Sequence, residues 1–161
     1  MSAGDEQRHL GAALGRIASG LFILTARQGK AETGMLTSWV QQCSFDPPQV
    51  SVAIKKGRDI TTWLTEGAPF TLNVLDDSQT DMIIHFGRGF TLDESAFEGL
   101  EVERPKGAAP VLRDTLAYLE CRVVSRCSAG DHELFIGQVV GGRVLGEGHP
   151  MMHIRKSGFH Y

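Results

Sequence analysis

The sequence lacks the features of a membrane, secreted or nucleic-acid-binding protein. No apolar run approaches the roughly 18 residues that a transmembrane helix needs, and residues 1–16 lack the apolar segment of a signal peptide. The three cysteines form no CxxC pair, so the simplest expectation is a reduced, intracellular compartment. A net charge of -3 and a pI near 6.0 argue against a nucleic-acid surface, which normally has a basic excess. We therefore expect a cytoplasmic protein with no nucleic-acid or membrane partner.

The composition is that of an ordinary globular protein, with 42% hydrophobic and 22% charged residues. A chain of 161 residues is most simply one domain, because a domain of that size buries roughly 70% of its unfolded surface. No internal repeat is visible. We therefore expect a single domain over residues 1–161.

The central stretch, residues 33–58, reads TGMLTSWVQQCSFDPPQVSVAIKKGR. It predicts one strand, a tight double-proline connection and a second strand. Side chains alternate along the second strand, because successive residues of a strand point to opposite faces. One face carries Val50, Val52 and Ile54, and the other carries Ser51, Ala53 and Lys55. The first face is expected in the core, and the second is small and polar.

Small residues on a strand leave room for a flat group against the backbone, and Thr37 and Ser38 offer the same on the first strand. Beyond the second strand, Lys55 and Arg58 precede a predicted capped helix at residues 59–64, and cations beside a helix N-terminus attract phosphate. A flat group and a phosphate indicate a mononucleotide-like cofactor such as a flavin. Two ordinary strands with a solvated basic turn are the alternative. Asp59 also opposes a phosphate unless its side chain caps its own helix.

The rest of the chain predicts short strands and few helices. Helices are expected at residues 5–18 and 77–86, and strands at 21–26, 70–75, 116–126, 133–140 and 143–145. Residues 87–115 form a long excursion with one short strand at 100–103. Such regular strands favour a closed or nearly closed barrel. His149 and His153 have the spacing of metal ligands on a helix, but Pro150 argues against a helix there, so no metal site is expected.

Several motifs together resemble the flavin reductase family, which has the FMN-binding split-barrel fold. They are GMLTSWVQQCSFDPPQVSVAIKKGR, FTLNVL at 70–75, LAYLECRV at 116–123, the Gly130, Asp131 and His132 turn, and HIRKSGFHY at 153–161. The chain is most similar to the flavin reductase-like domain of flavodiiron proteins, and the resemblance covers everything after the first twenty residues. It implies a mainly β, Greek-key split barrel with short helices, on which a helix within residues 1–20 packs. It also implies a homodimer with each flavin near the interface.

The resemblance further implies a set of site residues. The flavin would meet Thr37, Ser38, Trp39, Val40, Ala53, Ile54, Lys55, Arg58, Thr62, His85 and Phe86, with Arg58 holding the phosphate. The nicotinamide side would be Asp131, His132, His153 and Arg155. Three plainer readings stay open: Trp39 as a core residue, His132 as a turn residue, and Arg155 as an exposed charge. Leu36 stands where many relatives have Thr, which leaves the hydroxyl contact to the flavin open, and no catalytic residue is assigned.

The implied activity is hydride transfer from NADH or NADPH to FMN, with FAD as the alternative flavin. The reduced flavin or its electrons would pass to a partner oxygenase or flavodiiron-type protein. A flavin-binding electron carrier without its own NAD(P)H site is the main alternative. A haem-binding or purely structural split barrel has no supporting ligand pattern.

Overall fold

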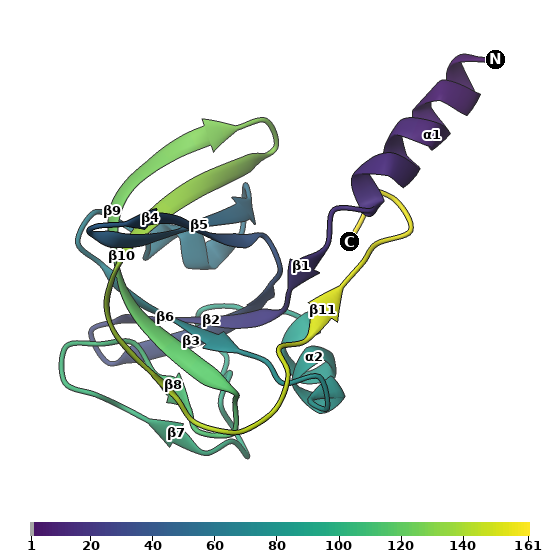
Figure 1. The fold of residues 1–161 in the computed structure, drawn as a ribbon. Coiled ribbons are helices and arrows are strands. Elements are labelled where there is room, and N and C mark those ends of the chain that lie inside the picture. Colours follow the sequence, from purple (N-terminus) through teal and green to yellow (C-terminus); the bar gives the residue numbers. More distant parts are fainter. Residues whose placement is uncertain (1) are drawn as a thin grey trace.

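The fold is built on one curved antiparallel sheet of seven strands, in the order β3-β2-β6-β9-β10-β5-β4. A computed structural model describes residues 2–161 of the chain. The seven strands are β2 (Phe22–Gln28), β3 (Ala31–Thr37), β4 (Val40–Phe45), β5 (Pro48–Lys55), β6 (Pro69–Val74), β9 (Ala117–Ala129) and β10 (His132–Val144) (Figure 1). The mainly β fold with short helices is thus confirmed.

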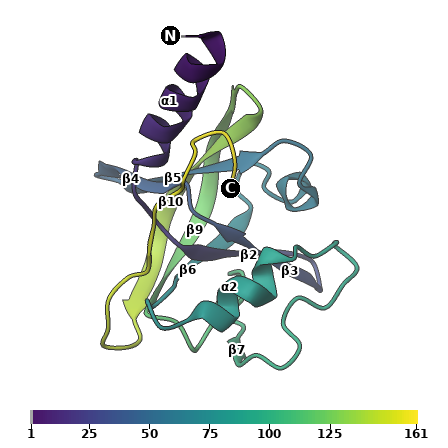
Figure 2. The same ribbon diagram turned by 90° about the vertical axis from the view of Figure 1, so that its right-hand side faces the viewer.

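Two small antiparallel pairs and three helical segments complete the chain. The pairs join β1 (Ser19–Gly20) to β11 (Met152–His153) and β7 (Val102–Glu103) to β8 (Val111–Leu112). The helical segments are α1 (Ala3–Gly15), α2 (Thr80–Gly87) and the 3-10 turn η1 (Asp59–Thr62). α2 lies against β3, one edge strand of the main sheet (Figure 2).

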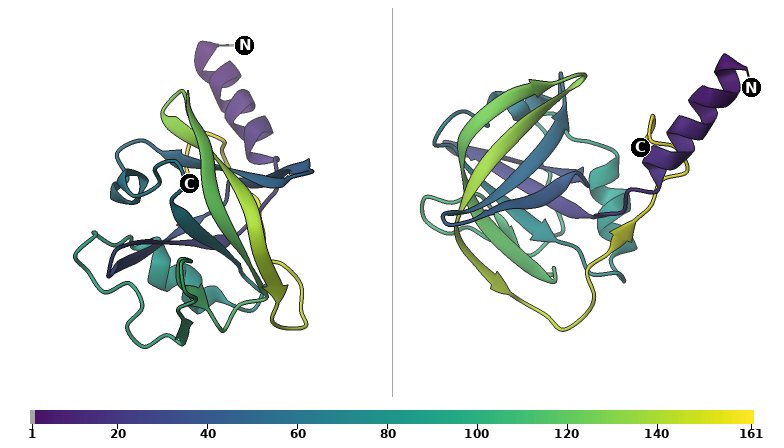
Figure 3. Two further views of the ribbon diagram at one scale, coloured as in Figure 1. Left: turned by 90° about the vertical axis from the view of Figure 1, so that its left-hand side faces the viewer. Right: turned by 45° about the horizontal axis from the view of Figure 1, so that its top comes forward.

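The strand expected to run from residue 33 to the prolines is interrupted, which is a correction to the prediction. β3 ends at Thr37 and β4 begins at Val40, yet the two strands are the opposite edges of the seven-strand sheet. Ser38 and Trp39 alone join them, and three Cα–Cα steps span at most about 11 Å. The sheet must therefore curl until its edges nearly meet, as the views in Figure 3 show. The edges are not hydrogen-bonded to each other, so the barrel is split, as expected.

The predicted alternation along β5 is confirmed. Val50, Val52 and Ile54 are 4%, 0% and 1% exposed. Ser51 and Ala53 are half-buried on the other face. A period-two pattern with one buried face fixes the register of this strand, because a slip of one residue would turn its three apolar side chains outward.

β10 is one long strand where two were expected. Gly141 and Gly142 continue the pairing with β9 through a register shift instead of turning the chain. Gly137 lies beneath the ring of Phe70, where a Cβ atom would fall 2.3 Å from the ring. These glycines therefore allow neighbouring strands and side chains to approach the β10 backbone closely. The sequence alone does not distinguish this role of glycine from a turn.

The excursion at residues 87–115 packs against the seven-strand sheet. The Leu112 N–H donates to Asn73 Oδ1 at 2.8 Å, and the Asn73 amide donates to the Ile23 carbonyl at 3.0 Å. Leu112 and Phe97 join a buried cluster with residues of β2 and α2. The excursion thus packs against the sheet and α2. Its strand β7 falls within the short strand predicted at residues 100–103, and the partner strand β8 was not predicted.

The N-terminal helix does not pack on the barrel, contrary to expectation. α1 projects away from the sheet (Figure 1), and Leu10 is 53% exposed. Only Gly11 and Gly15 of this helix are buried, and they face the C-terminal segment. A helix whose buried face is glycine offers a sheet little apolar surface, but it lets another backbone approach closely. Neither α1 nor α2 is long and apolar enough to cross a membrane, among the residues described.

Cys121 should resist alkylation in the native protein. Burial raises the pKa of its thiol from 9.0 to about 12, which lowers the reactive thiolate fraction about 1,000-fold. Cys43 and Cys127 are exposed. In iodoacetamide labelling followed by mass spectrometry, we expect two thiols to react rapidly and the third only after denaturation. Equal rates for all three thiols in the native protein would contradict the buried position of Cys121.

Candidate functional site

A cavity of about 300 Å³ opens where the sheet is split. Its size falls at the lower end of the range for small-molecule sites, about 300–1,000 Å³. The end of β3 and the Ser38–Trp39 connection form one side, and Ala53, Ile54 and Lys55 of β5 form another. The connection between β3 and β4 therefore lies in the wall of the cavity, where the end of β3 comes close to the end of β5.

One wall of the cavity is apolar. It consists of Leu21, Met35, Leu36, Ile83 and Phe86. Phe86 is 2% exposed and anchors α2 in the core. Side chains of this kind would exclude water from one face of a flat ligand.

Two hydroxyl groups face the cavity beside this wall. Thr37 and Ser38 line it and are 7% and 8% exposed. Among residues 2–161, every fully enclosed side-chain nitrogen or oxygen has a hydrogen-bond partner, and no hydrogen bond uses either of these hydroxyls. The two hydroxyls are therefore available to a ligand.

The polar end of the cavity carries Lys55 and Arg58. No ion pair found among residues 2–161 engages either cation. Gly89, which has a φ of 78°, lies close to Arg58, since a Cβ built on it would stand 3.8 Å from the guanidinium. Two unpaired cations at one end of an apolar cavity would attract an anionic group.

The predicted helix at residues 59–64 is only the 3-10 turn η1, and Asp59 does not cap it. The Thr61 hydroxyl donates to the Arg58 carbonyl at 2.6 Å, and the Thr62 hydroxyl donates to the Asp59 carbonyl at 2.7 Å. A turn this short contributes little dipole. Charge on the side chains, and not the helix end, is therefore what this site offers an anion.

A second cavity of about 290 Å³ adjoins the first and shares Trp39, Lys55 and Tyr161 with it. Asp131, His132 and Arg155 line the second cavity. The Arg155 guanidinium lies over the Trp39 ring at 4.9 Å, and the His132 ring lies 4.6 Å from the same ring. Trp39 thus lies where the two spaces adjoin, and it is half-buried instead of lying in the core.

His132 is held by hydrogen bonds on both ring nitrogens. Nδ1 lies 2.6 Å from Asp131 Oδ1, and Nε2 is hydrogen-bonded to the Tyr161 hydroxyl. His132 is 7% exposed, so its ring is fixed in the wall of the second cavity. The hydrogen bond with His132 holds the pKa of the Asp131 carboxyl below its ordinary value of 3.8. Asp131 is therefore ionised at neutral pH and accepts a hydrogen bond from Nδ1–H.

The structure gathers most of the sequence-predicted residues around the two cavities. The first is lined by Thr37, Ser38, Trp39, Ala53, Ile54, Lys55, Arg58, Phe86 and His153, and the second by Asp131, His132 and Arg155 as well as Trp39 and Lys55.

Three predicted residues lie outside both cavities. Val40 pairs with Val52 and packs on the core. Thr62 is exposed, with its hydroxyl bound to backbone. His85 turns toward the excursion, where Nε2 lies 2.8 Å from the Ala96 carbonyl oxygen. Hydrogen bonds to nearby backbone groups set the orientations of Thr62 and His85. The periodicity of strands and helices in the sequence does not predict such contacts.

Sequence reasoning missed Tyr161 and the apolar residues Ile83 and Leu36 as lining residues. Tyr161 belongs to the HIRKSGFHY segment, from which only His153 and Arg155 were selected. Its contact with His132 spans 29 residues and is set by the path of the C-terminal segment. The only available signal was an aromatic residue in a motif that already carried site candidates.

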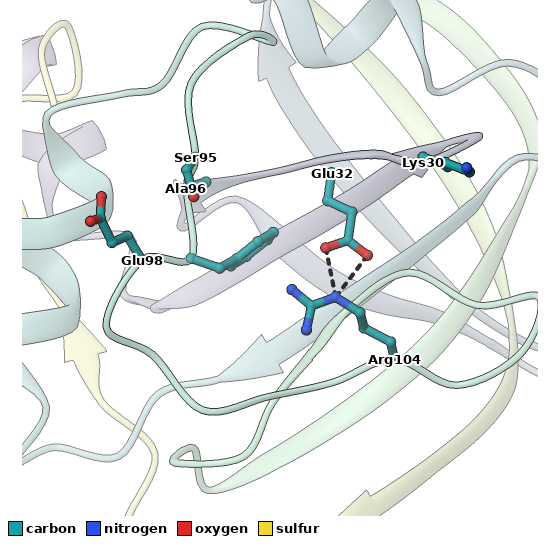
Figure 4. A pocket seen from close by; sticks show the side chains of 7 residues that line it. Lys30, Glu32, Ser95, Ala96, Glu98 and Arg104 are labelled. Carbon is teal, nitrogen blue, oxygen red and sulfur yellow. Dashed lines mark hydrogen bonds and ion pairs between the residues drawn. The ribbon is translucent and has the colours of Figure 1, made fainter.

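A third cavity of about 590 Å³ shares no residue with the other two. Figure 4 shows that Arg104 and Glu32 face each other there; Arg104 Nε donates to both carboxylate oxygens, at 3.2 and 2.9 Å. Phe97, which also lines this cavity, is only 8% exposed. This space has neither an unpaired Arg nor an accessible aromatic face, so it is the weaker candidate.

Comparison with known proteins places these residues in context. Residues 14–160 match the family described as the flavin reductase like domain. The chain is 40% identical over 151 residues to diflavin flavoprotein A 1 of Synechocystis sp., covering 92% of this chain. It spans only 26% of that relative, about a quarter of its length.

Two solved structures are similar over most of both chains. The NADH:FAD oxidoreductase SgcE6 of Streptomyces globisporus has a TM-score of 0.81 at 23% identity, covering 89% of this chain and 85% of that one. The styrene monooxygenase flavin reductase of Pseudomonas putida has a TM-score of 0.74 at 28% identity, covering 89% and 90%. At 23% identity, the similarity to SgcE6 shows a shared fold alone.

Replacing His132 with Ala should raise the pKa of Asp131 toward 3.8, because the hydrogen bond with His132 is the largest cause of its lowering. Because the pKa of Asp131 is lower in the folded state than in the unfolded chain, its ionisation stabilises the fold at pH values above the unfolded-state pKa. This stabilisation is lost as the pH falls through the folded-state pKa. Carboxyl carbon NMR titration measures the change. Asp93, whose lowered pKa depends first on Thr91, is the internal control and should not move. An unchanged Asp131 titration would show that the pair is not formed.

Proposed function

The chain belongs to the flavin reductase-like domain family, and from this we propose that it is an NAD(P)H-dependent flavin reductase that binds FMN. One observation carries the proposal. An apolar cavity with unpaired cations at one end adjoins a second cavity, and the linings of the two share Trp39, Lys55 and Tyr161. A flavin and a nicotinamide must lie beside each other for hydride transfer, and two adjoining spaces provide for both.

The residues of the first cavity fit a flavin mononucleotide. Thr37 and Ser38 present unbound hydroxyls for the polar edge of the ring, and the apolar wall excludes water from its face. Arg58 and Lys55 would hold the phosphate, since guanidinium and ammonium groups bind phosphate through charge-assisted hydrogen bonds. We propose FMN because the cavity-lining cations fit one phosphate, with FAD as the alternative.

Bound flavin supplies the hydride acceptor, and the protein positions the reactants. In the second cavity, the Asp131 carboxylate fixes His132 with its proton on Nδ1. Arg155, lying over Trp39, offers a cation to the phosphates of NADH or NADPH. None of these residues needs to form a covalent bond to substrate.

The acceptor is proposed to be an oxygenase or a flavodiiron-type protein. This proposal is supported by the similarity of the chain to a diflavin flavoprotein and to the flavin reductase of a styrene monooxygenase. We also propose a cytoplasmic homodimer with the flavin near the interface. Val144, Met152 and Ile154 are 73%, 63% and 61% exposed, and a second copy would cover such side chains.

An absorbance spectrum recorded anaerobically before and after NADH or NADPH tests the proposal. Purified protein, reconstituted with FMN, should show flavin bands that bleach when reduced nicotinamide is added. Bands that persist with both nucleotides would favour an electron carrier without its own nicotinamide site. No flavin binding at all would overturn the proposed function.

Arg58→Ala should weaken FMN binding. A charge-assisted hydrogen bond contributes about 1.5–3 kcal/mol, so the dissociation constant should rise about 10- to 100-fold. Flavin fluorescence titration measures the change. Arg88→Ala is the matched control, because Arg88 lies over the Phe90 ring and lines neither cavity. Equal affinities for the two variants would remove Arg58 from the phosphate site.

A further inference from the structure

The C-terminal segment 155–161, here called the strap, crosses the site and ends at Tyr161. It docks on the glycine face of α1: Arg155 N–H donates to the Gly15 carbonyl at 3.2 Å, and Gly158 N–H donates to the Gly11 carbonyl at 2.6 Å. A Cβ on Gly15 would lie 2.5 Å from the Arg155 carbonyl oxygen. The fit therefore requires glycine at this position.

Both ends of the strap reach the site. Arg155 lies over Trp39, and the Tyr161 ring lies 5.7 Å from Trp39 and 6.0 Å from His132. Tyr161 lines both cavities. Tyr161 is 66% exposed, so packing alone does not account for its placement. Its hydrogen bond with His132 is the specific contact that holds it there.

The hydrogen-bond roles follow from the partners. A carboxylate only accepts, so His132 donates from Nδ1 to Asp131, and Nε2 of the neutral ring is then an acceptor. The Tyr161 O–H therefore donates to Nε2. Partial burial also raises the pKa of Tyr161 above its ordinary value of 10.0, so the hydroxyl keeps its proton at neutral pH. With its only proton committed to His132, the hydroxyl oxygen has lone pairs left for an N–H donor.

We propose that Tyr161, held by the docked strap and by His132, positions the nicotinamide by accepting a hydrogen bond from its carboxamide. This inference rests on the proposed function, because it assumes that the second cavity receives a nicotinamide. The carboxamide is the one N–H donor on that ring. A site that hydrogen-bonds a substrate N–H discriminates against an analogue that lacks it.

Binding of oxidised dinucleotides tests the proposal without measuring turnover. The probes are NAD+ and its analogue with an acetyl group in place of the carboxamide, titrated by calorimetry into the FMN-loaded protein. The parent should prefer NAD+. Tyr161→Phe should weaken NAD+ binding roughly 3- to 10-fold, the range for one neutral hydrogen bond, and leave the analogue unchanged. Tyr118→Phe is the control, since Tyr118 lies in β9 and lines neither cavity.

The outcomes separate the two proposals. A Phe variant that keeps the full preference for NAD+ overturns the role of Tyr161 and leaves the flavin reductase proposal standing. A parent that binds neither dinucleotide overturns the role of Tyr161, and bleaching of the flavin bands by NADH or NADPH decides the flavin reductase proposal separately. Histidine 15N NMR gives an independent readout, because loss of the tyrosine hydroxyl should shift the His132 Nε2 signal, and an unshifted signal would contradict the hydrogen bond.

Docking of the strap can be tested away from both cavities. Gly15→Ala should displace Arg155 and weaken NAD+ binding, since its Cβ would meet the Arg155 carbonyl oxygen. Gly4→Ala is the matched control on the same helix, because its Cβ would make only an ordinary 3.8 Å contact with Ser2. Equal NAD+ affinity for these two variants would show that α1 does not hold the strap over the site.

Discussion

The two-residue connection between β3 and β4 is the constraint on which this structure depends. It joins the opposite edges of a seven-strand sheet, so the sheet must curl until those edges nearly meet. The Ala53 N–H donates to the Trp39 carbonyl at 3.0 Å, which fixes the connection against β5. β3 and β4 do not pair with each other, and the cavity with its two hydroxyls lies between the end of β3, the connection and the end of β5.

The same constraint sets the position of Trp39. The backbone of this residue is bound to β5, so its ring is fixed between the cavity at the split and the cavity beside His132. Lys55, opposite His132 in the β5–β10 pairing, lines both spaces from the end of the same strand. The β5 strand therefore supplies core packing on one face and the charged end of the site on the other.

Local patterns predicted the parts of the fold that depend on local physics. The alternation of β5 was readable because burial of Val50, Val52 and Ile54 gives a period-two signal. The sheet order was not, because the partners of β5 in β10 lie about 80 residues further along the chain. The glycines of β10 resembled a turn, since close approach and chain reversal select the same residue.

Site prediction from the sequence had similar limits. Residues on strand ends, such as Thr37, Ser38 and Ala53, line the cavity because strand geometry fixes where they point. Thr62 and His85 turn to nearby carbonyls, and Tyr161 is placed by a strap whose path depends on α1.

A crystal structure of the protein with FMN would test the central claim most directly. The account predicts the ring against residues 37–39 and the phosphate against Arg58, and an FMN bound in the cavity beside Arg104 and Glu32 would contradict it.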